Sequence, residues 1–274
     1  PVRDVDELTS LFPVPVLGSI PTIKHRGDRA LSPWLFPPRA FEPVRMVRVQ
    51  LELSCTVPTP VIMVTSAGAA DGKTTVVGAL AAAFSESGQK VIVMDLDLRK
   101  PSLARTLGVE IPSQVTTRNG EFEPPLGDLI SVPRLDNVSL LTLPAANMSS
   151  IDEVMLRLPL LVAQARHLAG CVILDTAPVG EVSEALRIAP LCDTVLFVAR
   201  PRHTDRRRLI LAHDLLTRAA VRTAGTVVVG ESTANNYGAY YGDGYREANR
   251  PGGREERVSF LDRVMSGQPG RRVE

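Results

Sequence analysis

The chain has few aromatic residues, few cysteines, no excess of charge and no long apolar run. Its three cysteines are widely spaced and form no CxxC pair, so neither a disulfide framework nor a thiolate metal site is expected. They are expected to be small buried residues in a reducing compartment. Its four histidines lack the spacing of zinc ligands. No apolar run approaches the roughly 20 residues that span a bilayer. The 31 Lys+Arg almost cancel the 30 Asp+Glu, so overall charge does not favour a nucleic-acid partner.

All the tyrosines of the chain lie close together near its C-terminus. They are Tyr237, Tyr240, Tyr241 and Tyr245. Glycine, alanine and aspartate separate them, and their spacing fits neither the two-residue period of a strand nor one face of a helix. A Gly-rich stretch of this kind is typical of a flexible tail, which we place at residues 232–274.

The remainder divides into a proline-rich N-terminal segment and a domain of alternating helices and strands. Residues 1–38 include LFPVPVLGSIP and LSPWLFPP, a pattern that predicts an irregular linker. In residues 39–231, helical stretches alternate with apolar runs of the buried-strand type, which are VIMVTS, VIVMDLD, CVILD, DTVLFVA and GTVVVG. This alternation predicts an α/β fold with a mostly parallel sheet of the P-loop NTPase type and helices on both faces.

The segment SAGAADGKTT follows the first of these strands and opens a helix. In that context a Gly-rich turn predicts a phosphate loop, because amides at a helix N-terminus bind anions. Lys73 is expected to reach the β- and γ-phosphates of ATP, and Thr74 to bind Mg²⁺. Ala67 replaces the first Gly of the strict pattern, and a plain Gly-rich turn is the alternative. The predicted phosphate-binding residues are Ala69, Ala70, Asp71, Gly72, Lys73, Thr74 and Thr75.

Three carboxylates are predicted to lie at the same edge of the sheet as this loop. Asp95 and Asp97 end the run VIVMDLD, and Asp175 ends CVILD. The carboxyl ends of parallel strands meet at one edge, where ligands gather in such folds. Carboxylates beside a phosphate loop are what Mg²⁺ and phosphoryl transfer require. The predicted magnesium ligands are therefore Thr74, Asp95, Asp97 and Asp175.

Together these motifs resemble those of the bacterial tyrosine kinases, the autophosphorylating partners of polysaccharide co-polymerases. Members have a relaxed Walker A loop, a Walker A′ motif of apolar residues and DxDxR, and a Walker B motif of apolar residues and DxxP. They also have an ExxRxxR helix before the first strand and a C-terminal tyrosine cluster. The corresponding segments here are 67–74, 95–99, 175–178, the trio Glu42, Arg45 and Arg48, and residues 237–245.

The resemblance implies an ATP- and Mg²⁺-dependent tyrosine autokinase with Lys73, Asp95, Asp97 and Asp175 as catalytic residues. It implies that Tyr237, Tyr240, Tyr241 and Tyr245 accept phosphate in trans within a ring-like homo-oligomer, whose contacts include Glu42, Arg45 and Arg48. An exposed intrahelical salt bridge is the alternative for that trio. Family sheets often end in an Asn that helps to hold adenine, and Val229 stands nearest to that position.

The resemblance also implies cellular partners. These are a membrane polysaccharide co-polymerase module, in the same or another chain, and a phosphotyrosine phosphatase. The expected location is the cytoplasmic face of the bacterial plasma membrane, with an anchor outside residues 1–274. The expected role is regulation of the synthesis or export of capsular polysaccharide or exopolysaccharide.

Two other functions fit parts of the sequence. A partitioning-type ATPase would hydrolyse ATP without modifying protein, although the extra loop lysine of that group would fall at Gly68. A nucleotide-binding scaffold would use its tyrosines as an adhesive tail.

A basic run, PRHTDRRRL, precedes the last strand of the predicted sheet. Thr204 is expected to cap a helix that begins there. Cations at a helix N-terminus are unfavourable, which suggests an anionic partner for them, although a solvated face is the common explanation of such a run. The cations are Arg202, Arg206, Arg207 and Arg208.

Overall fold

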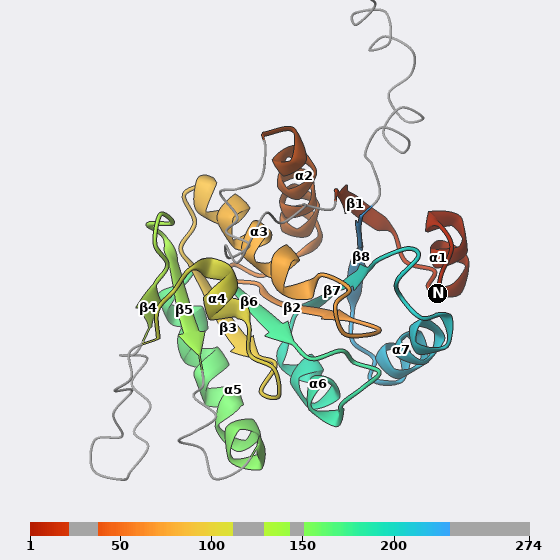
Figure 1. Ribbon diagram of the computed structural model, residues 1–274. Coiled ribbons are helices and arrows are strands. Elements are labelled where there is room, and N and C mark those ends of the chain that lie inside the picture. Colours follow the sequence, from red (N-terminus) through yellow and green to blue (C-terminus); the bar gives the residue numbers. More distant parts are fainter. Residues whose placement is uncertain (22–37, 112–128, 143–150, 231–274) are drawn as a thin grey trace, which may run out of the picture. The chain divides into compact units, whose positions relative to one another are not determined.

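Figure 1 shows a computed structural model of the chain, which describes residues 1–21, 38–111, 129–142 and 151–230. The described residues form a sheet with the strand order β1-β8-β7-β2-β6-β3-β5-β4. Neighbouring strands are parallel except β4 and β5. The strands are β1 (Val16–Ile20), β2 (Val61–Ser66), β3 (Val91–Leu96), β4 (Ile130–Ser131), β5 (Val138–Thr142), β6 (Cys171–Thr176), β7 (Thr194–Ala199) and β8 (Thr223–Val229).

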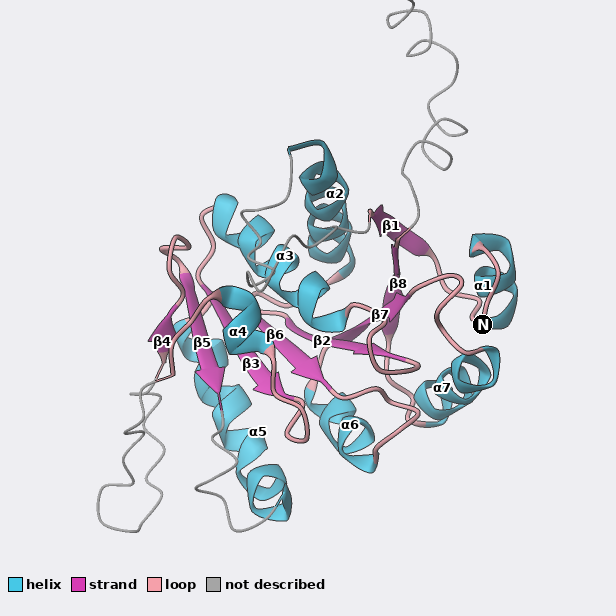
Figure 2. Cartoon of the chain, viewed as in Figure 1, coloured by secondary structure: helices cyan, strands magenta, loops and turns pink. Residues whose placement is uncertain are grey.

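Helices cover both faces of the sheet (Figure 2). One face packs against α2 (Pro38–Ser54), α3 (Lys73–Glu86) and α4 (Leu103–Leu107). The other packs against α1 (Val5–Leu11), α5 (Ile151–Leu168), α6 (Ser183–Ile188) and α7 (Arg206–Arg218), with the short 3₁₀ helix η4 (Ala189–Leu191) after α6. The predicted α/β fold with a mostly parallel sheet is confirmed.

The strands are apolar throughout because both of their faces are buried. In β2, Ile62 and Val64 belong to the core beneath α2 and α3, whereas Val61 and Met63 belong to the core on the opposite face. All four side chains are fully buried. This is the two-residue alternation of a strand between two helical layers, and it explains why continuous apolar runs located the central strands correctly.

The N-terminal segment is more regular than its proline pattern predicts. We expected an irregular linker over residues 1–38, but residues 5–11 form α1 and residues 16–20 form the edge strand β1, parallel to β8. The Thr226 amide donates to the Pro15 carbonyl at 2.7 Å, and the Gly230 amide to Ile20 at 2.8 Å. Prolines are compatible with an edge strand because one side of it needs no ladder hydrogen bonds.

Two further expectations need correction. The N-cap of α7 is Asp205 and not Thr204, since the Asp205 side chain accepts a hydrogen bond from the Arg208 amide at 3.0 Å. Of the three free cysteines, expected to be small buried residues, only Cys171 is fully buried, and Cys55 and Cys192 are half-buried. In the described ranges, no helix has the length and apolar character needed to cross a membrane.

Candidate functional site

The predicted phosphate loop connects β2 to α3. Ala70 and Gly72 have left-handed backbone conformations, with φ of 62° and 105°. Gly72 is also the N-cap of α3, and no side chain among the described residues caps this helix. The first amides of α3 are therefore available to a ligand, and the helix dipole favours an anion at that position.

A cleft of about 960 Å³ opens above this loop. Six of the seven predicted phosphate-binding residues line it, which are Ala69, Ala70, Gly72, Lys73, Thr74 and Thr75. Its lining extends from Ile20 and Val229, paired at the ends of β1 and β8, to Asp97 beyond β3. The cleft therefore runs along the carboxyl edge of the sheet, the usual ligand site of such folds, with a volume typical of small-molecule sites.

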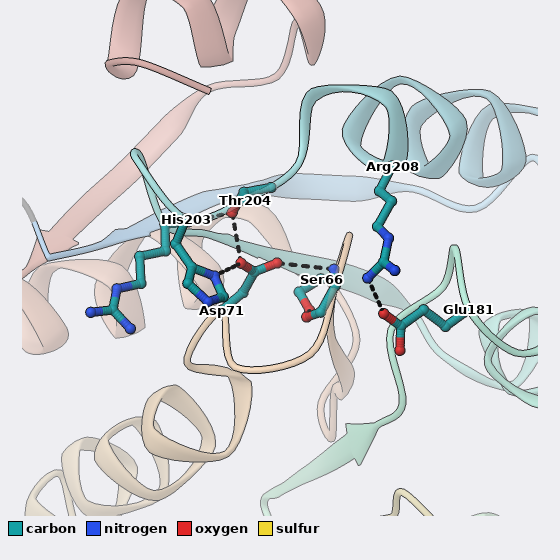
Figure 3. A network of polar contacts seen from close by, with 8 residues as sticks. Ser66, Asp71, Glu181, His203, Thr204 and Arg208 are labelled. Atoms are coloured by element: carbon teal, nitrogen blue, oxygen red, sulfur yellow. Dashed lines mark hydrogen bonds and ion pairs between the residues drawn. The ribbon is translucent and has the colours of Figure 1, made fainter. Parts of the chain in front are cut away.

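Asp71 is the exception among the predicted loop residues, because its side chain is fully buried. Its carboxylate accepts a hydrogen bond from the Gly68 amide at 3.0 Å and another from the Thr204 hydroxyl at 2.7 Å. His203 Nδ1 lies 3.1 Å from the same carboxylate (Figure 3). This side chain holds the loop to the segment between β7 and α7.

Two of the three predicted carboxylates lie side by side beneath the loop. Asp95 in β3 and Asp175 in β6 are direct partners in the parallel ladder. Their exposed fractions are 2% and 1%. One oxygen of Asp95 accepts hydrogen bonds from the Ser102 and Leu103 amides, both at 3.0 Å. Its other oxygen and both oxygens of Asp175 have no hydrogen-bond partner among the described residues.

Burial alters the acidity of both groups. It raises the pKa of Asp95 to about 6, although the amide hydrogen bonds oppose this change. It raises the pKa of Asp175 to about 8, and repulsion from Asp95 adds to the effect. The nearby Thr74 hydroxyl and Lys73 ammonium act in the opposite direction, but in the structure the Thr74 hydroxyl is paired with Ser102 Oγ at 3.2 Å.

Asp97 differs from the other two carboxylates. It is half-buried and lines the cleft, and its side chain accepts a hydrogen bond from the Lys100 amide at 3.1 Å. No group of three or more His, Cys, Asp or Glu side chains in the described part of the chain forms a ready-made metal site. Mg²⁺ commonly uses only one or two carboxylates together with substrate phosphates, so the residues present fit a metal that arrives with a nucleotide.

Four cationic residues that were not predicted as site residues also line the cleft, which are Arg99, Lys100, Arg105 and Arg200. Arg99 is bound to Glu184 at 2.9 Å. The run DLDLRKP signals Arg99 and Lys100, because they directly follow the carboxylates at a strand end. Arg105 lies on α4 and Arg200 follows β7, and only the tertiary fold brings these two to the cleft.

The remaining predicted residues lie elsewhere. Arg45 on α2 contacts Glu42 at 3.0 Å and Glu86 of α3 at 2.9 Å. Arg48 is paired with Glu52 at 2.7 Å. Both arginines are thus engaged within the chain, which accords with the salt-bridge alternative and leaves a subunit contact untested. The tyrosine cluster, residues 237–245, lies outside the described residues.

Comparison with known proteins shows which proteins this chain is similar to. Residues 58–170 match the model of the ParA family, described as a NUBPL iron-transfer P-loop NTPase. The tyrosine-protein kinase CpsD of Streptococcus agalactiae is 25% identical over 195 residues, which cover 69% of this chain and 84% of CpsD. The kinase domain of the Escherichia coli tyrosine kinase ETK superposes with a TM-score of 0.68 at 23% identity, covering 86% of this chain and 99% of that domain. The chain is thus similar in sequence to bacterial tyrosine kinases over about two thirds of its length, and it shares the fold of their kinase domains.

The relatives that match this chain differ greatly in length. The succinoglycan biosynthesis transport protein ExoP of Rhizobium meliloti is 28% identical over 189 residues. These cover 66% of this chain but only 23% of ExoP. The similarity therefore concerns one part of the longer protein.

A substitution at Gly72 tests whether the loop conformation matters for nucleotide binding. A Cβ atom at this position would lie 3.2 Å from a Val229 methyl group, in a backbone conformation that other residues rarely adopt. We expect Gly72→Ala to lower the free energy of unfolding by about 1–2 kcal/mol and to weaken nucleotide binding. Urea unfolding and calorimetric titration with Mg-ADP measure the two effects.

Gly88→Ala is the matched control for this change. Gly88 also has a positive φ, of 83°, but a Cβ atom there meets nothing within 4 Å. It follows the C-terminal end of α3, whereas the loop adjoins the N-terminal end. Gly88→Ala should cost similar stability with no loss of nucleotide affinity, and equal losses of affinity in the two variants would contradict this account of the loop.

Proposed function

We propose that the chain is an ATP- and Mg²⁺-dependent protein-tyrosine kinase that phosphorylates its own C-terminal tyrosines in trans. The observation that carries the proposal is the direct pairing of Asp95 and Asp175 beneath the phosphate loop, where three of their buried oxygens have no hydrogen-bond partner among the described residues. The loop leads into α3, whose N-terminus no described side chain caps. Buried polar atoms without hydrogen bonds are unfavourable, and such atoms gathered at a phosphate site favour a cation as their missing partner. The proposed acceptors are Tyr237, Tyr240, Tyr241 and Tyr245.

The loop and the start of α3 would hold the triphosphate. Backbone amides from residue 69 to 75 are suited to the phosphate oxygens, and Lys73 to the β- and γ-phosphates. Thr74, Asp95, Asp97 and Asp175 are the candidate ligands of Mg²⁺, directly or through water. When bound, Mg²⁺ would neutralise charge that develops on the transferring phosphoryl group.

A tyrosine hydroxyl has a pKa near 10 and is mostly neutral at pH 7, so alignment with the γ-phosphate matters more than deprotonation. Asp95 is our candidate to orient the hydroxyl or accept its proton. One of its oxygens is held by two amides, which fixes the orientation of the carboxylate. Asp97 and Asp175 would then act chiefly on the metal.

The setting of the activity follows from the relatives. One of them, ExoP, is named a succinoglycan biosynthesis transport protein, and succinoglycan is a polysaccharide. We infer that this kinase regulates polysaccharide synthesis or export at the cytoplasmic face of the plasma membrane. A membrane co-polymerase module and a phosphotyrosine phosphatase are its proposed partners.

Mixing two inactive variants tests both the activity and its trans character. Lys73→Met retains the tyrosines but lacks the loop lysine, and a variant with all four tyrosines changed to phenylalanine retains the site. We expect neither variant to label itself with radioactive ATP and Mg²⁺, whereas their mixture should label the Lys73→Met chain. The phenylalanine variant should bind ATP like the parent.

The same mixture tests the proposed ring. We infer that the α2 surface with Glu42, Arg45 and Arg48 contacts a neighbouring subunit. Light scattering of the parent should then give a mass that is a multiple of the chain mass. In the mixture of the two variants, the rate of labelling should increase with protein concentration. Label in the parent combined with none in the mixture would instead indicate transfer within one chain.

The match of residues 58–170 to the ParA family favours a second candidate, a partitioning-type ATPase switch without protein kinase activity. It predicts release of inorganic phosphate by the parent and by the phenylalanine variant, with no label on either protein. The position of the extra loop lysine of such switches is occupied by Gly68, which argues for the kinase.

A further inference from the structure

A carboxylate lies buried inside the predicted phosphate loop. This is unexpected, because an anionic ligand such as phosphate is bound best by positively charged groups. The Asp71 carboxylate has an exposed fraction of 0%. One of its oxygens accepts a hydrogen bond from the Gly68 amide, within the loop. The other accepts one from the Thr204 hydroxyl, in the segment between β7 and α7 (Figure 3). Because its oxygens are satisfied, the carboxylate can remain buried.

Thr204 is itself held firmly in place. Its hydroxyl accepts a hydrogen bond from the Arg200 amide at 2.8 Å and donates to Asp71, so both roles of the hydroxyl are used. Its carbonyl accepts a hydrogen bond from the Val2 amide at 2.8 Å. Its exposed fraction is 1%. Thr204 thus provides a rigid anchor outside the loop.

The residues on both sides of Asp71 need such an anchor. Ala70 and Gly72 have φ of 62° and 105°, and the left-handed conformation is strained for alanine. Strained residues persist only where their surroundings hold them. Left-handed residues also turn successive amides toward a common point where an anion binds. The contacts of Asp71 therefore act on the backbone that presents the amides to the phosphates.

We propose that Asp71 and Thr204 form a clamp that holds the phosphate loop in its binding conformation before the nucleotide arrives. Both are positioning residues that act through the loop amides and make no contact with the phosphates. This inference rests on the proposed function, because the ligand in question is a nucleotide polyphosphate. It assigns Asp71 a role different from the phosphate contact that its place in the motif predicts.

Thr204→Val tests the clamp with little change in shape, since it replaces the hydroxyl by a methyl group. We expect the Kd for Mg-ADP, measured by calorimetric titration on the full chain, to rise about tenfold, which corresponds to about 1.4 kcal/mol. Thr204→Ser keeps the hydroxyl and should bind Mg-ADP within about twofold of the parent, a rescue that a purely packing role would not produce.

Thr194→Val is the matched control. Thr194 is fully buried in β7 and its hydroxyl donates to the Arg222 carbonyl at 3.2 Å, but it lies at the amino end of the strand, away from the cleft. We expect its melting temperature to fall as in Thr204→Val while its Kd for Mg-ADP stays at the parent value.

Asp71→Asn and the double variant Asp71→Asn/Thr204→Val measure how far Asp71 and Thr204 act on nucleotide affinity through their shared hydrogen bond. Residues that act through one contact are not additive, so the double variant should bind Mg-ADP no more weakly than Asp71→Asn alone. Parental affinity in Thr204→Val, or fully additive losses in the double variant, would overturn the clamp and leave the proposed function standing. A parent that fails to bind Mg-ADP would overturn the proposed function, and the clamp with it.

Discussion

Changing Lys73 to methionine is expected to reduce phosphate transfer to tyrosine at least about a hundredfold. Lys73 is the first residue of α3, with an exposed fraction of 7%, and it lines the cleft beside the buried carboxylates. Removing one preorganised group that stabilises charge in a transition state typically costs a factor of about 10² to 10³. The rate of label transfer from ATP to the chain measures the effect, under conditions where the parent is saturated with nucleotide.

The variant should still fold. Methionine fills nearly the same space as lysine, and it places no charged group at this buried position. Lys90→Met is the control. Lys90 is exposed and precedes β3, at the opposite end of that strand from the cleft. It should transfer phosphate at the parent rate. Unchanged transfer in Lys73→Met with a normal melting temperature would remove Lys73 from the mechanism and weaken the assignment of the whole loop.

Changing Asp175 to asparagine is expected to stabilise the nucleotide-free protein while abolishing Mg²⁺-dependent nucleotide binding. Neither oxygen of this buried carboxylate has a hydrogen-bond partner in the part of the chain that the structure describes, and the group lies beside Asp95. Its charged form is therefore unfavourable. One pKa unit corresponds to about 1.4 kcal/mol. If the free energy of unfolding at pH 8 increased by at least that amount, the melting temperature would rise by about 2–4 °C or more for a domain of this size.

The pH dependence of stability gives a second measure of the same carboxylates. The pKa of Asp175 is raised to about 8 and that of Asp95 to about 6, whereas an unfolded Asp has a pKa of about 3.9. Between these values the folded state binds more protons than the unfolded state, so stability falls as pH rises. The contribution of Asp95 to the free energy of unfolding should decrease between about pH 4 and 6, and that of Asp175 between about pH 4 and 8.

Thermal unfolding in the presence of a chelator, at intervals from pH 5 to 8.5, measures this dependence. Asp175→Asn should flatten the upper part of the curve, between about pH 6 and 8. Asp136→Asn is the control, because Asp136 is exposed just before the amino end of β5, away from the cleft, and its removal leaves the buried pair unchanged. We expect it to keep the parent curve. A parent whose melting temperature rises from pH 6 to 8 with the same slope as Asp175→Asn would show that Asp175 is not a strained buried acid.

Much of the candidate site could be predicted because its parts are local in sequence. The phosphate loop needs only a strand end, a Gly-rich turn and a helix start within ten residues, SAGAADGKTT. Asp95 and Asp175 each end an apolar run, and parallel strands align such ends. The side-chain direction of Asp71 could not be predicted, because its partners Thr204 and His203 lie far along the chain.

The N-terminal segment shows why local patterns can mislead. Prolines at 13, 15 and 21 bracket a stretch of five residues, which has no sequence signal of its own for a sheet. Its place as β1 depends on hydrogen bonds from β8, two hundred residues later. Arg105 and Arg200 entered the cleft unpredicted for the same reason, since each lies on an element whose position depends on packing.

The amino-acid sequence by itself therefore determined the parallel sheet, the loop and the edge at which the acids gather, because periodicity and short motifs specify strands, turns and their ends. Only the tertiary structure decided which groups touch. It brought Asp95 and Asp175 into register, buried both, and joined Asp71 to Thr204, because contacts between distant segments and the exclusion of water depend on how the whole chain packs.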